Sequence, residues 1–214
     1  QKEQLEQFAA TVSHDLRNPL NVITGRLDLV QQECSSEHLD VIETATDRME
    51  RIIEDLLWLT REQREIGSQE PVAIETAAEA AWNIAADPAD DAEVYCDCGG
   101  ATQTLIRADV DQFQHLLENL FRNAIDHAGA DVTVVVGMIS SDDVGFYIED
   151  DGPGIPAEER EKVFNPGYST SEAGTGIGLN ITKRVVDAHG WDIRVTESSI
   201  GGTRFEITGL EIIE

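Results

Sequence analysis

The sequence carries chemically active side chains in three places, and the first is a histidine on a predicted helix. His14 is followed directly by Asp15, and Asn18 lies four residues after the histidine, on the same side. An apolar stripe on the opposite side predicts a helix over residues 3–32: Leu5, Phe8, Val12, Leu16, Leu20, Ile23, Leu27 and Val30. An exposed imidazole beside a carboxylate is a reactive group, although many solvated histidines on helices have no role.

The second place is a predicted helix over residues 110–128 that presents two carboxamides. Asp109 can cap this helix, with Gln112 closing a capping box. Asn119 and Asn123 are four residues apart and therefore share one face of an otherwise apolar helix. Carboxamide oxygens can hold a hard cation such as Mg²⁺. Buried asparagines that only satisfy backbone groups are the commoner alternative.

The third place consists of two glycine-rich segments. Asp150 stands where a hydrophobic run ends and can accept a hydrogen bond from an exocyclic amine, while Gly152 and Gly154 let the backbone approach a flat ligand. Residues 174–179 open a predicted helix, and their glycines and free amides are typical of a phosphate-binding loop. Either segment alone is weak evidence, because a glycine-rich turn is often only a turn.

The elements that must position these residues divide near residue 68. After a short turn at residues 35–36, a second apolar seam predicts another helix that ends near residue 64: Ile42, Ala45, Met49, Ile52, Leu56 and Leu59. Two such helices form a hairpin over residues 1–66, which cannot bury both stripes fully by itself. A four-helix bundle made by two chains would do so. An inert dimerisation stalk is the alternative interpretation.

Residues 67–71 predict a linker, and residues 72–214 predict a second domain of mixed helices and strands. Helices are expected at 76–87, 110–128, 157–163 and 177–189. Strands are expected at 72–75, 93–98, 103–108, 132–139, 143–149, 192–198 and 203–209. Because strands and helices do not alternate strictly, an antiparallel or mixed sheet covered by helices on one face is favoured over a doubly wound fold.

The composition excludes several kinds of partner. The 214 residues include 15 Lys and Arg against 42 Asp and Glu, a net charge of −27, which would repel nucleic acid and anionic membranes. Such lysine-poor acidity is typical of proteins from salt-accumulating halophiles, although an acidic mesophilic protein is the alternative.

Cys34, Cys96 and Cys98 fit no disulfide framework and favour a reducing, cytoplasmic setting. No apolar run predicts a membrane span or signal peptide, and the start within a helix suggests a fragment that follows a sensor domain.

Together these segments resemble the catalytic core of a sensor histidine kinase of two-component systems. The resemblance rests on five motifs in order: an H box at 13–20, an N box at 116–128, a G1 box at 150–155, an F-box remnant at 163–168 and a G2 box at 174–179. It implies an α+β protein, in which a HisKA hairpin forms a dimeric four-helix bundle and an α/β-sandwich of the Bergerat or GHKL type binds ATP. A halophilic archaeal source is part of this expectation.

The resemblance also implies a role for each matching residue. His14 would accept the phosphoryl group, Asp15 would take the imidazole proton, and Asn18 would orient a water that dephosphorylates the partner response regulator. The residues expected to bind ATP and Mg²⁺ are Asn119, Asn123, His127, Asp150, Gly152, Gly154, Gly174, Thr175, Gly176, Gly178, Leu179 and Thr203. Asn119 and Asn123 would serve the metal, Asp150 would read the adenine amino group, and residues 165–176 would form a mobile lid.

Two segments depart from the usual family pattern. Asp126 and His127 replace the basic and aromatic residues common after the N-box asparagines, and residues 165–173 contain no Lys or Arg. The phosphate charge must then be met by Mg²⁺, loop amides, Arg122 or Lys183, and ambient K⁺. His127 can stack on the nucleotide or be a plain surface residue.

Two other functions compete with the kinase. A GHKL-type ATPase clamp, as in DNA gyrase, shares the nucleotide fold but lacks an H box on a helical hairpin. A catalytically silent dimeric adaptor is the second alternative. The kinase interpretation implies a homodimer, a response-regulator receiver domain as partner, and neither nucleic-acid binding nor direct membrane insertion by this segment.

Overall fold

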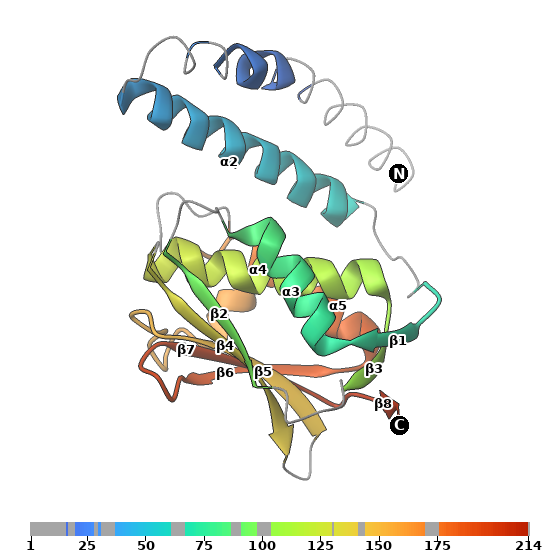
Figure 1. Ribbon diagram of the computed structural model, residues 1–214. Helices are drawn as coiled ribbons and strands as arrows, with labels where there is room; N and C mark the ends of the chain where they lie inside the picture. The colour runs from blue at the N-terminus through green and yellow to red at the C-terminus, as the bar shows by residue number, and fades with distance from the viewer. Residues whose placement is uncertain are drawn as a thin grey trace. The chain divides into compact units, whose positions relative to one another are not determined.

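The computed structural model describes residues 16, 20–27, 30, 37–60, 67–86, 91–97, 104–129, 131–140, 144–169 and 176–213 (Figure 1). The chain divides into two compact units, residues 1–64 and 65–214, and each unit is described by itself. Within the described residues, no helix is both long and apolar enough to cross a bilayer.

The first unit contains helix α2, Glu37–Thr60, and described helical residues at 16, 20–27 and 30. Leu20 of the earlier helix and Ile53 of α2 are buried in one apolar cluster, as expected for a hairpin. Other stripe residues stay exposed in the single chain: Leu16, Ile23, Val30, Ile42 and Met49. The hairpin therefore buries only part of its apolar surface by itself.

The second unit is built on two sheets. The larger sheet has the order β2-β4-β5-β7-β6, with β2 and β4 parallel and the other neighbours antiparallel, which confirms the expected mixed sheet. Its strands are β2 (Glu93–Asp97), β4 (Thr133–Ser140), β5 (Val144–Asp150), β6 (Asp192–Glu197) and β7 (Thr203–Thr208). The smaller antiparallel sheet consists of β1 (Glu70–Ala73), β3 (Leu105–Ala108) and β8 (Ile212–Ile213).

Three helices cover one face of the larger sheet (Figure 1): α3 (Ile74–Ala85), α4 (Val110–Ala128) and α5 (Gly178–His189). Alternate residues of β5 and β7 point toward them because the side-chain period of a strand is two. The core between sheet and helices is fully buried and includes Phe113, Leu116, Leu120, Val134, Phe146, Ile148, Ile181, Phe205 and Ile207. Phe113 of α4 meets Phe146 of β5 edge to face, with ring centroids 5.7 Å apart. This packing fixes α4 over the strand that ends at Asp150.

The structure differs from the expected elements at three places. The small sheet is separate from the main one, and β8 has too few residues to give a sequence pattern. Strand β1 begins at Glu70, inside the predicted linker, and α3 begins two residues early at Ile74. Residues 157–161 form turns and are followed by the 3₁₀ helix η1, Lys162–Phe164, where one longer helix was expected. Only Val163 of residues 157–164 is buried, so packing does not extend this short helix.

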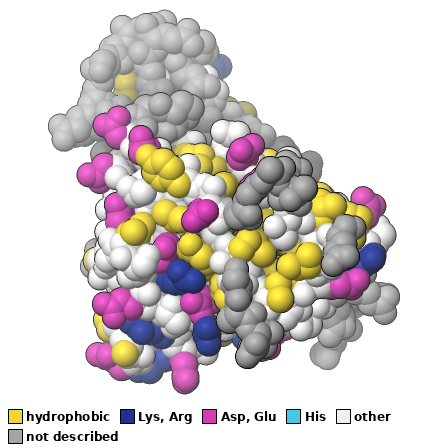
Figure 2. All heavy atoms as spheres, turned by 60° about the horizontal axis from the view of Figure 1, so that its bottom comes forward, with side chains coloured by type: hydrophobic (Ala, Val, Ile, Leu, Met, Phe, Trp, Pro, Cys, Tyr) yellow, Lys and Arg dark blue, Asp and Glu magenta, His cyan; other side chains and the backbone are white. Residues whose placement is uncertain are grey.

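Acidic side chains are distributed over the surface. Figure 2 shows Asp and Glu at many separate positions on the face that it presents, with fewer Lys and Arg among them. The net charge of −27 therefore does not come from one acidic tail. Repulsion on such a surface falls as salt screens it.

Candidate nucleotide site and phospho-acceptor segment

Helix α4 begins at a capping residue that joins three parts of the second unit. Oδ1 of Asp109 accepts from the Gln112 backbone amide at 3.1 Å, and Oδ2 accepts from the Gly67 amide at 2.9 Å. The Asp109 amide donates to Nε2 of His189 at 3.0 Å. The predicted cap is confirmed, but the predicted capping box is wrong. The Gln112 side chain bonds the Asp109 carboxylate at 3.2 Å, because His189 already occupies the amide that it would have bound.

Asn119, Asn123 and His127 follow one another at intervals of four along α4 and so share one side of it. Burial decreases along this row: Asn119 is 8% exposed, Asn123 is half-buried and His127 is exposed. The Nδ2 atom of Asn119 is buried, and no described residue makes a hydrogen bond with it. A 180° rotation of the carboxamide exchanges its oxygen and nitrogen, so either atom can face a ligand. A buried carboxamide with an unused polar atom fits a site that a metal ion or phosphate completes.

Asp150, at the end of β5, presents one oxygen to the protein and leaves the other unused by the described residues. Oδ1 accepts from the amides of Gly152 at 2.9 Å and Thr203 at 3.0 Å. No donor among the described residues reaches Oδ2. The side chain is 6% exposed, and burial raises its pKa, while the two amides and nearby His127 act in the opposite direction. A carboxylate held in this way is suited to accept from a ligand N–H.

Three glycines allow the backbone to pack closely around Asp150. A Cβ atom at Gly202 would lie 2.1 Å from Oδ1 of Asp150, and one at Gly152 would lie 2.5 Å from Cβ of Ala128 at the end of α4. Gly154 has φ +75°, and a Cβ there would lie 3.3 Å from the Gly202 carbonyl oxygen. A side chain at Gly202 would therefore displace the Asp150 carboxylate, and one at Gly152 would displace the end of α4.

The start of α5 lies against the N-box asparagine, and the residue two before it, Gly176, contacts the beginning of the predicted lid. A Cβ atom at Gly178 would lie 3.3 Å from Oδ1 of Asn119. Gly176 has φ +66° and accepts from the Gly167 amide at 3.0 Å, so the two ends of the predicted lid are joined. Leu179 is half-buried in the first turn of α5. Gly174 and Thr175 lie outside the described residues.

The two basic residues considered for phosphate neutralisation both have acidic partners. A guanidinium nitrogen of Arg122 lies 3.6 Å from Oε2 of Glu118, one turn earlier on α4. Lys183 forms an ion pair with Asp187 on α5. Each positive charge is therefore partly offset locally before any phosphate arrives.

Two domain families match separate parts of this chain. Residues 4–65 match the His Kinase A phospho-acceptor domain, and residues 108–211 match the histidine kinase-, DNA gyrase B-, and HSP90-like ATPase. A gyrase-like ATPase clamp would not account for the phospho-acceptor match over residues 4–65, because such clamps lack this helical hairpin. This chain belongs to the sensor histidine kinases. The residues of the H box, His14, Asp15 and Asn18, lie in the matched phospho-acceptor domain but outside the described residues.

Named relatives agree with this family. The kinase is 33% identical over 203 residues to the sensor protein IrlS of Burkholderia pseudomallei, covering 87% of this chain and 43% of that protein. It is 29% identical over 219 residues to the sensor histidine kinase CpxA of Escherichia coli, covering 94% of this chain and 46% of that protein. The chain thus spans less than half the length of these relatives.

Solved structures share the fold. The mycobacterial sensor histidine kinase MprB superposes with a TM-score of 0.58 at 26% identity, over 66% of this chain and 97% of that one. Full-length ShkA, solved in complex with AMPPNP, superposes with a TM-score of 0.71 at 23% identity, over 97% of this chain and 46% of that one. The α+β architecture predicted from the sequence is confirmed.

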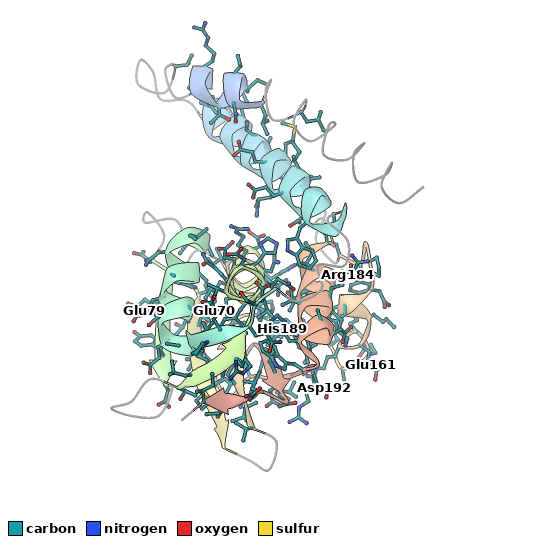
Figure 3. The ribbon with its side chains drawn as sticks, turned by 90° about the vertical axis from the view of Figure 1, so that its right-hand side faces the viewer. Glu70, Glu79, Glu161, Arg184, His189 and Asp192 are labelled. Carbon is teal, nitrogen blue, oxygen red and sulfur yellow. The ribbon has the colours of Figure 1, made fainter. Side chains whose placement is uncertain are left out.

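Three residues that shape the kinase site were not assigned a role from the sequence. Gly202 lies against Asp150, His189 receives the Asp109 amide, and Glu149 binds the turn that carries Gly202 and Thr203. His189 is labelled at the end of α5 in Figure 3. The only sequence signal for any of them is the Gly201-Gly202 pair, which predicts a tight turn without saying what packs on it.

Proposed function

We propose that this chain is the catalytic core of a sensor kinase that uses ATP to phosphorylate His14 and then transfers the phosphoryl group to an aspartate of a response-regulator receiver domain. Residues 1–66 would carry dimerisation and phosphotransfer, residues 67–71 the linker, and residues 72–214 ATP binding. The observation that carries the proposal is Asp150 at the end of a buried strand, whose Oδ1 accepts from two amides while Oδ2 accepts from none of the described residues.

In this function, Oδ2 of Asp150 accepts from the adenine amino group, and Gly152, Gly154 and Thr203 line the base. The amides of residues 174–178 bind phosphate oxygens, with Thr175 and Leu179 at the same helix start and His127 beside the nucleotide. Asn119 and Asn123 would hold Mg²⁺ and phosphate through their carboxamides. The buried Nδ2 atom of Asn119 makes no hydrogen bond with the described residues, which supports the phosphate contact. Mg²⁺, when bound, neutralises charge on the phosphate oxygens.

The transfer step is an in-line substitution at the γ-phosphorus of ATP. An imidazole nitrogen of His14 forms the N–P bond as the bond to the bridging oxygen of ADP breaks, and Asp15 takes the ring proton. An aspartate carboxylate oxygen of the receiver domain then attacks the phosphorus of the phosphohistidine. The N–P bond breaks as a proton returns from Asp15 to the ring, which releases neutral imidazole. In the phosphatase activity, Asn18 orients the water that hydrolyses the phosphoaspartate to aspartate and inorganic phosphate.

The charge of the phosphates is met without a basic lid. Since Arg122 and Lys183 each face a carboxylate, Mg²⁺ and the loop amides carry most of this task. Ambient K⁺ screens the remaining repulsion from the acidic surface. The same surface supports an origin in a salt-accumulating organism, a halophilic archaeon, over an acidic mesophile.

The partners follow from the two units. Exposed apolar residues of the hairpin, including Ile42 and Met49, support burial against a second copy in a four-helix bundle. The surface around His14 would dock the receiver domain, and an upstream sensor domain would supply the signal from outside this segment. The charge of −27 argues against nucleic acid as a partner, and the expected setting is the cytoplasm.

The test is incubation with γ-labelled ATP and Mg²⁺, comparing the native chain with His14→Gln. An acid-labile, base-stable label that disappears in His14→Gln is the expected result, because phosphohistidine is hydrolysed by acid. ATP turnover without label would select the ATPase clamp, and binding without turnover or label would select the silent adaptor. Asp150→Asn provides the matched control, since it should lower the label by weakening ATP binding while leaving His14 in place.

A further inference from the structure

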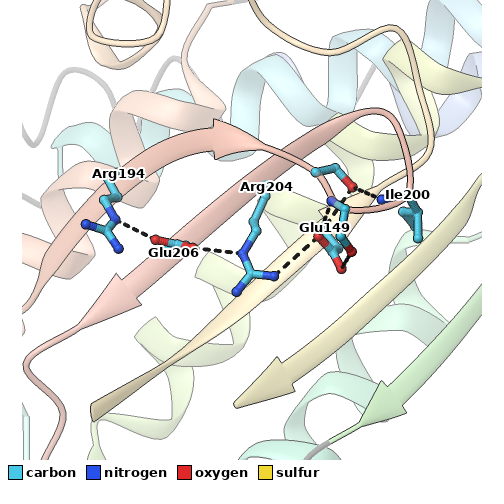
Figure 4. Close-up of polar contacts among 7 residues, drawn as sticks. Glu149, Arg194, Ile200, Arg204 and Glu206 are labelled. Carbon is cyan, nitrogen blue, oxygen red and sulfur yellow. Dashed lines mark hydrogen bonds and ion pairs between the residues drawn. The ribbon is translucent and has the colours of Figure 1, made fainter. Parts of the chain in front are cut away.

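Glu149 directly precedes Asp150 on β5 and points to the opposite face of the sheet. It is only 3% exposed, and its carboxylate binds the turn between β6 and β7. Oε2 accepts from the Ser199 amide at 2.9 Å and from the Ser198 hydroxyl at 3.3 Å, and Oε1 accepts from the Ser199 hydroxyl at 2.8 Å. Figure 4 shows these contacts at the end of the strand. One buried carboxylate thus holds the start of the turn.

The other end of the same turn holds Asp150. The Ser198 amide donates to the Gly202 carbonyl at 3.0 Å and closes the turn. The Gly202 amide donates to the Asp150 carbonyl at 3.1 Å, and the Thr203 amide donates to Oδ1 of Asp150 at 3.0 Å. Two neighbouring residues of one strand therefore bind a single turn from opposite faces of the sheet.

The Glu149 contacts are charge-assisted. Burial acts to raise the pKa of Glu149, but the Ser199 bonds and the Arg204 guanidinium outweigh it, and the pKa is lowered. A guanidinium nitrogen of Arg204 lies 3.4 Å from Oε2 of Glu149, and Arg204 also stacks on the Tyr147 ring at 3.5 Å. Ionised acceptors make stronger bonds to amides and hydroxyls than neutral ones do.

We propose that Glu149 is a positioning residue for nucleotide recognition, which fixes the 198–203 turn so that the Thr203 amide engages Oδ1 of Asp150 and leaves Oδ2 for the adenine amino group. The inference rests on the proposed role of Asp150. Without Glu149, the turn would lose its anchor on the outer face of the sheet. The Thr203 amide would then no longer select which oxygen of Asp150 faces the base.

Glu206 offers a control on the same sheet face. It accepts from Nε of Arg204 at 2.8 Å and pairs with Arg194, so it belongs to the same row of ion pairs (Figure 4). It makes no hydrogen bond to the 198–203 turn among the described residues. If the row mattered only for the stability of the sheet, Glu149→Gln and Glu206→Gln would behave alike.

The experiment measures the affinities of the whole chain for ADP and for IDP, which has a carbonyl oxygen in place of the adenine amino group. Glu149→Gln is expected to weaken ADP binding roughly fivefold while IDP binding changes less than about twofold, because only ADP uses Oδ2 of Asp150. Ser199→Ala, in the exposed turn, should lower the ratio of ADP affinity to IDP affinity by a smaller factor. Glu206→Gln should leave this ratio unchanged.

Asp150→Asn separates this inference from the proposed function. If Asp150→Asn lowers the ADP-to-IDP preference but Glu149→Gln and Ser199→Ala do not, the positioning role of Glu149 is overturned. If Glu149→Gln weakened the affinities for ADP and IDP equally, Glu149 would have a structural role only, and this result would also overturn the inference. If Asp150→Asn itself leaves the preference unchanged, the adenine contact is wrong and the inference falls with it.

Discussion

Gly178 of α5 lies directly against Asn119 of α4, so that a Cβ atom at residue 178 would stand 3.3 Å from the Asn119 Oδ1 atom. This is the point where the glycine-rich segment meets the N-box helix. The two motifs are 59 residues apart, as 178 minus 119 shows, and neither predicts the other. The contact makes Gly178 a spacing residue for the carboxamide that is proposed to hold Mg²⁺.

Gly178→Ala should weaken Mg-ADP binding about tenfold, because the added methyl group displaces the Asn119 carboxamide. The free energy of unfolding should stay level or rise by up to about 1 kcal/mol, since alanine favours a helix more than glycine does. Calorimetric titration and urea unfolding measure the two effects.

The matched control for that change is Gly190→Ala, at the other end of α5. Gly190 has φ +74° and no heavy atom within 4 Å of a built Cβ. Alanine there should lower the free energy of unfolding by about 1 kcal/mol through backbone strain and leave Mg-ADP affinity unchanged. Equal affinity losses in both variants would contradict the spacing role of Gly178.

Gly202→Ala should be among the most damaging changes in the second unit. Its Cβ would lie 2.1 Å from Oδ1 of Asp150 and 2.5 Å from the Gly152 amide nitrogen, so strand end and turn must separate. The expected cost is about 3 kcal/mol in urea unfolding, with loss of thermal stabilisation by ADP. A Cβ atom at Gly201 would have no heavy atom within 4 Å. Gly201→Ala should cost stability because of the φ of +120°, but the variant should still be thermally stabilised by ADP.

Acid should destabilise this protein through His115 on α4. Burial and the nearby Arg122 guanidinium lower the pKa of His115 from 6.5 to about 4. Between these values the unfolded chain binds a proton that the folded chain does not, so stability is complete above pH 6.5 and is lost as the pH falls toward 4. The full effect is on the order of 3 kcal/mol. Urea unfolding at several pH values measures it.

His115→Gln should flatten this pH dependence, and His127→Gln, an exposed change on the same helix, should leave it in place. A residual slope is expected because burial also lowers the pKa of His189, which would lose its bond from the Asp109 amide on protonation. A slope that His115→Gln leaves unaltered would mean that His115 is protonated equally in both states.

Potassium chloride should stabilise the folded chain. With a net charge of −27, screening between about 0.1 M and 2 M KCl should raise the urea midpoint, because repulsion acts mostly in the compact state. ADP affinity should rise over the same range, since the two basic residues considered for the phosphates, Arg122 and Lys183, are each paired with a carboxylate. Unchanged midpoint and affinity would remove the argument for adaptation to high salt.

Much of the site could be predicted because its motifs are local. Asn119 and Asn123 share a helix face whenever residues 110–128 are helical, and Asp150 stands at a strand end whenever residues 144–150 form a strand. The turn contacts could not be predicted in this way. Thr203 meets Asp150 across 53 positions, and His189 meets Asp109 across 80. Such pairs depend on how the strands and helices pack.

The sequence by itself determined the periodicity of the helices, the order of the motifs and the kinds of functional group that they supply. These are properties of neighbouring residues, and the repeats of helix and strand express them directly. Only the tertiary structure decided that His189 accepts from the amide expected to bond Gln112, and that Gly178 borders Asn119. It also decided which oxygen of Asp150 accepts from the Thr203 amide. Each of these depends on which residues distant in the sequence come into contact, and the packing of the sheet against its helices sets those contacts.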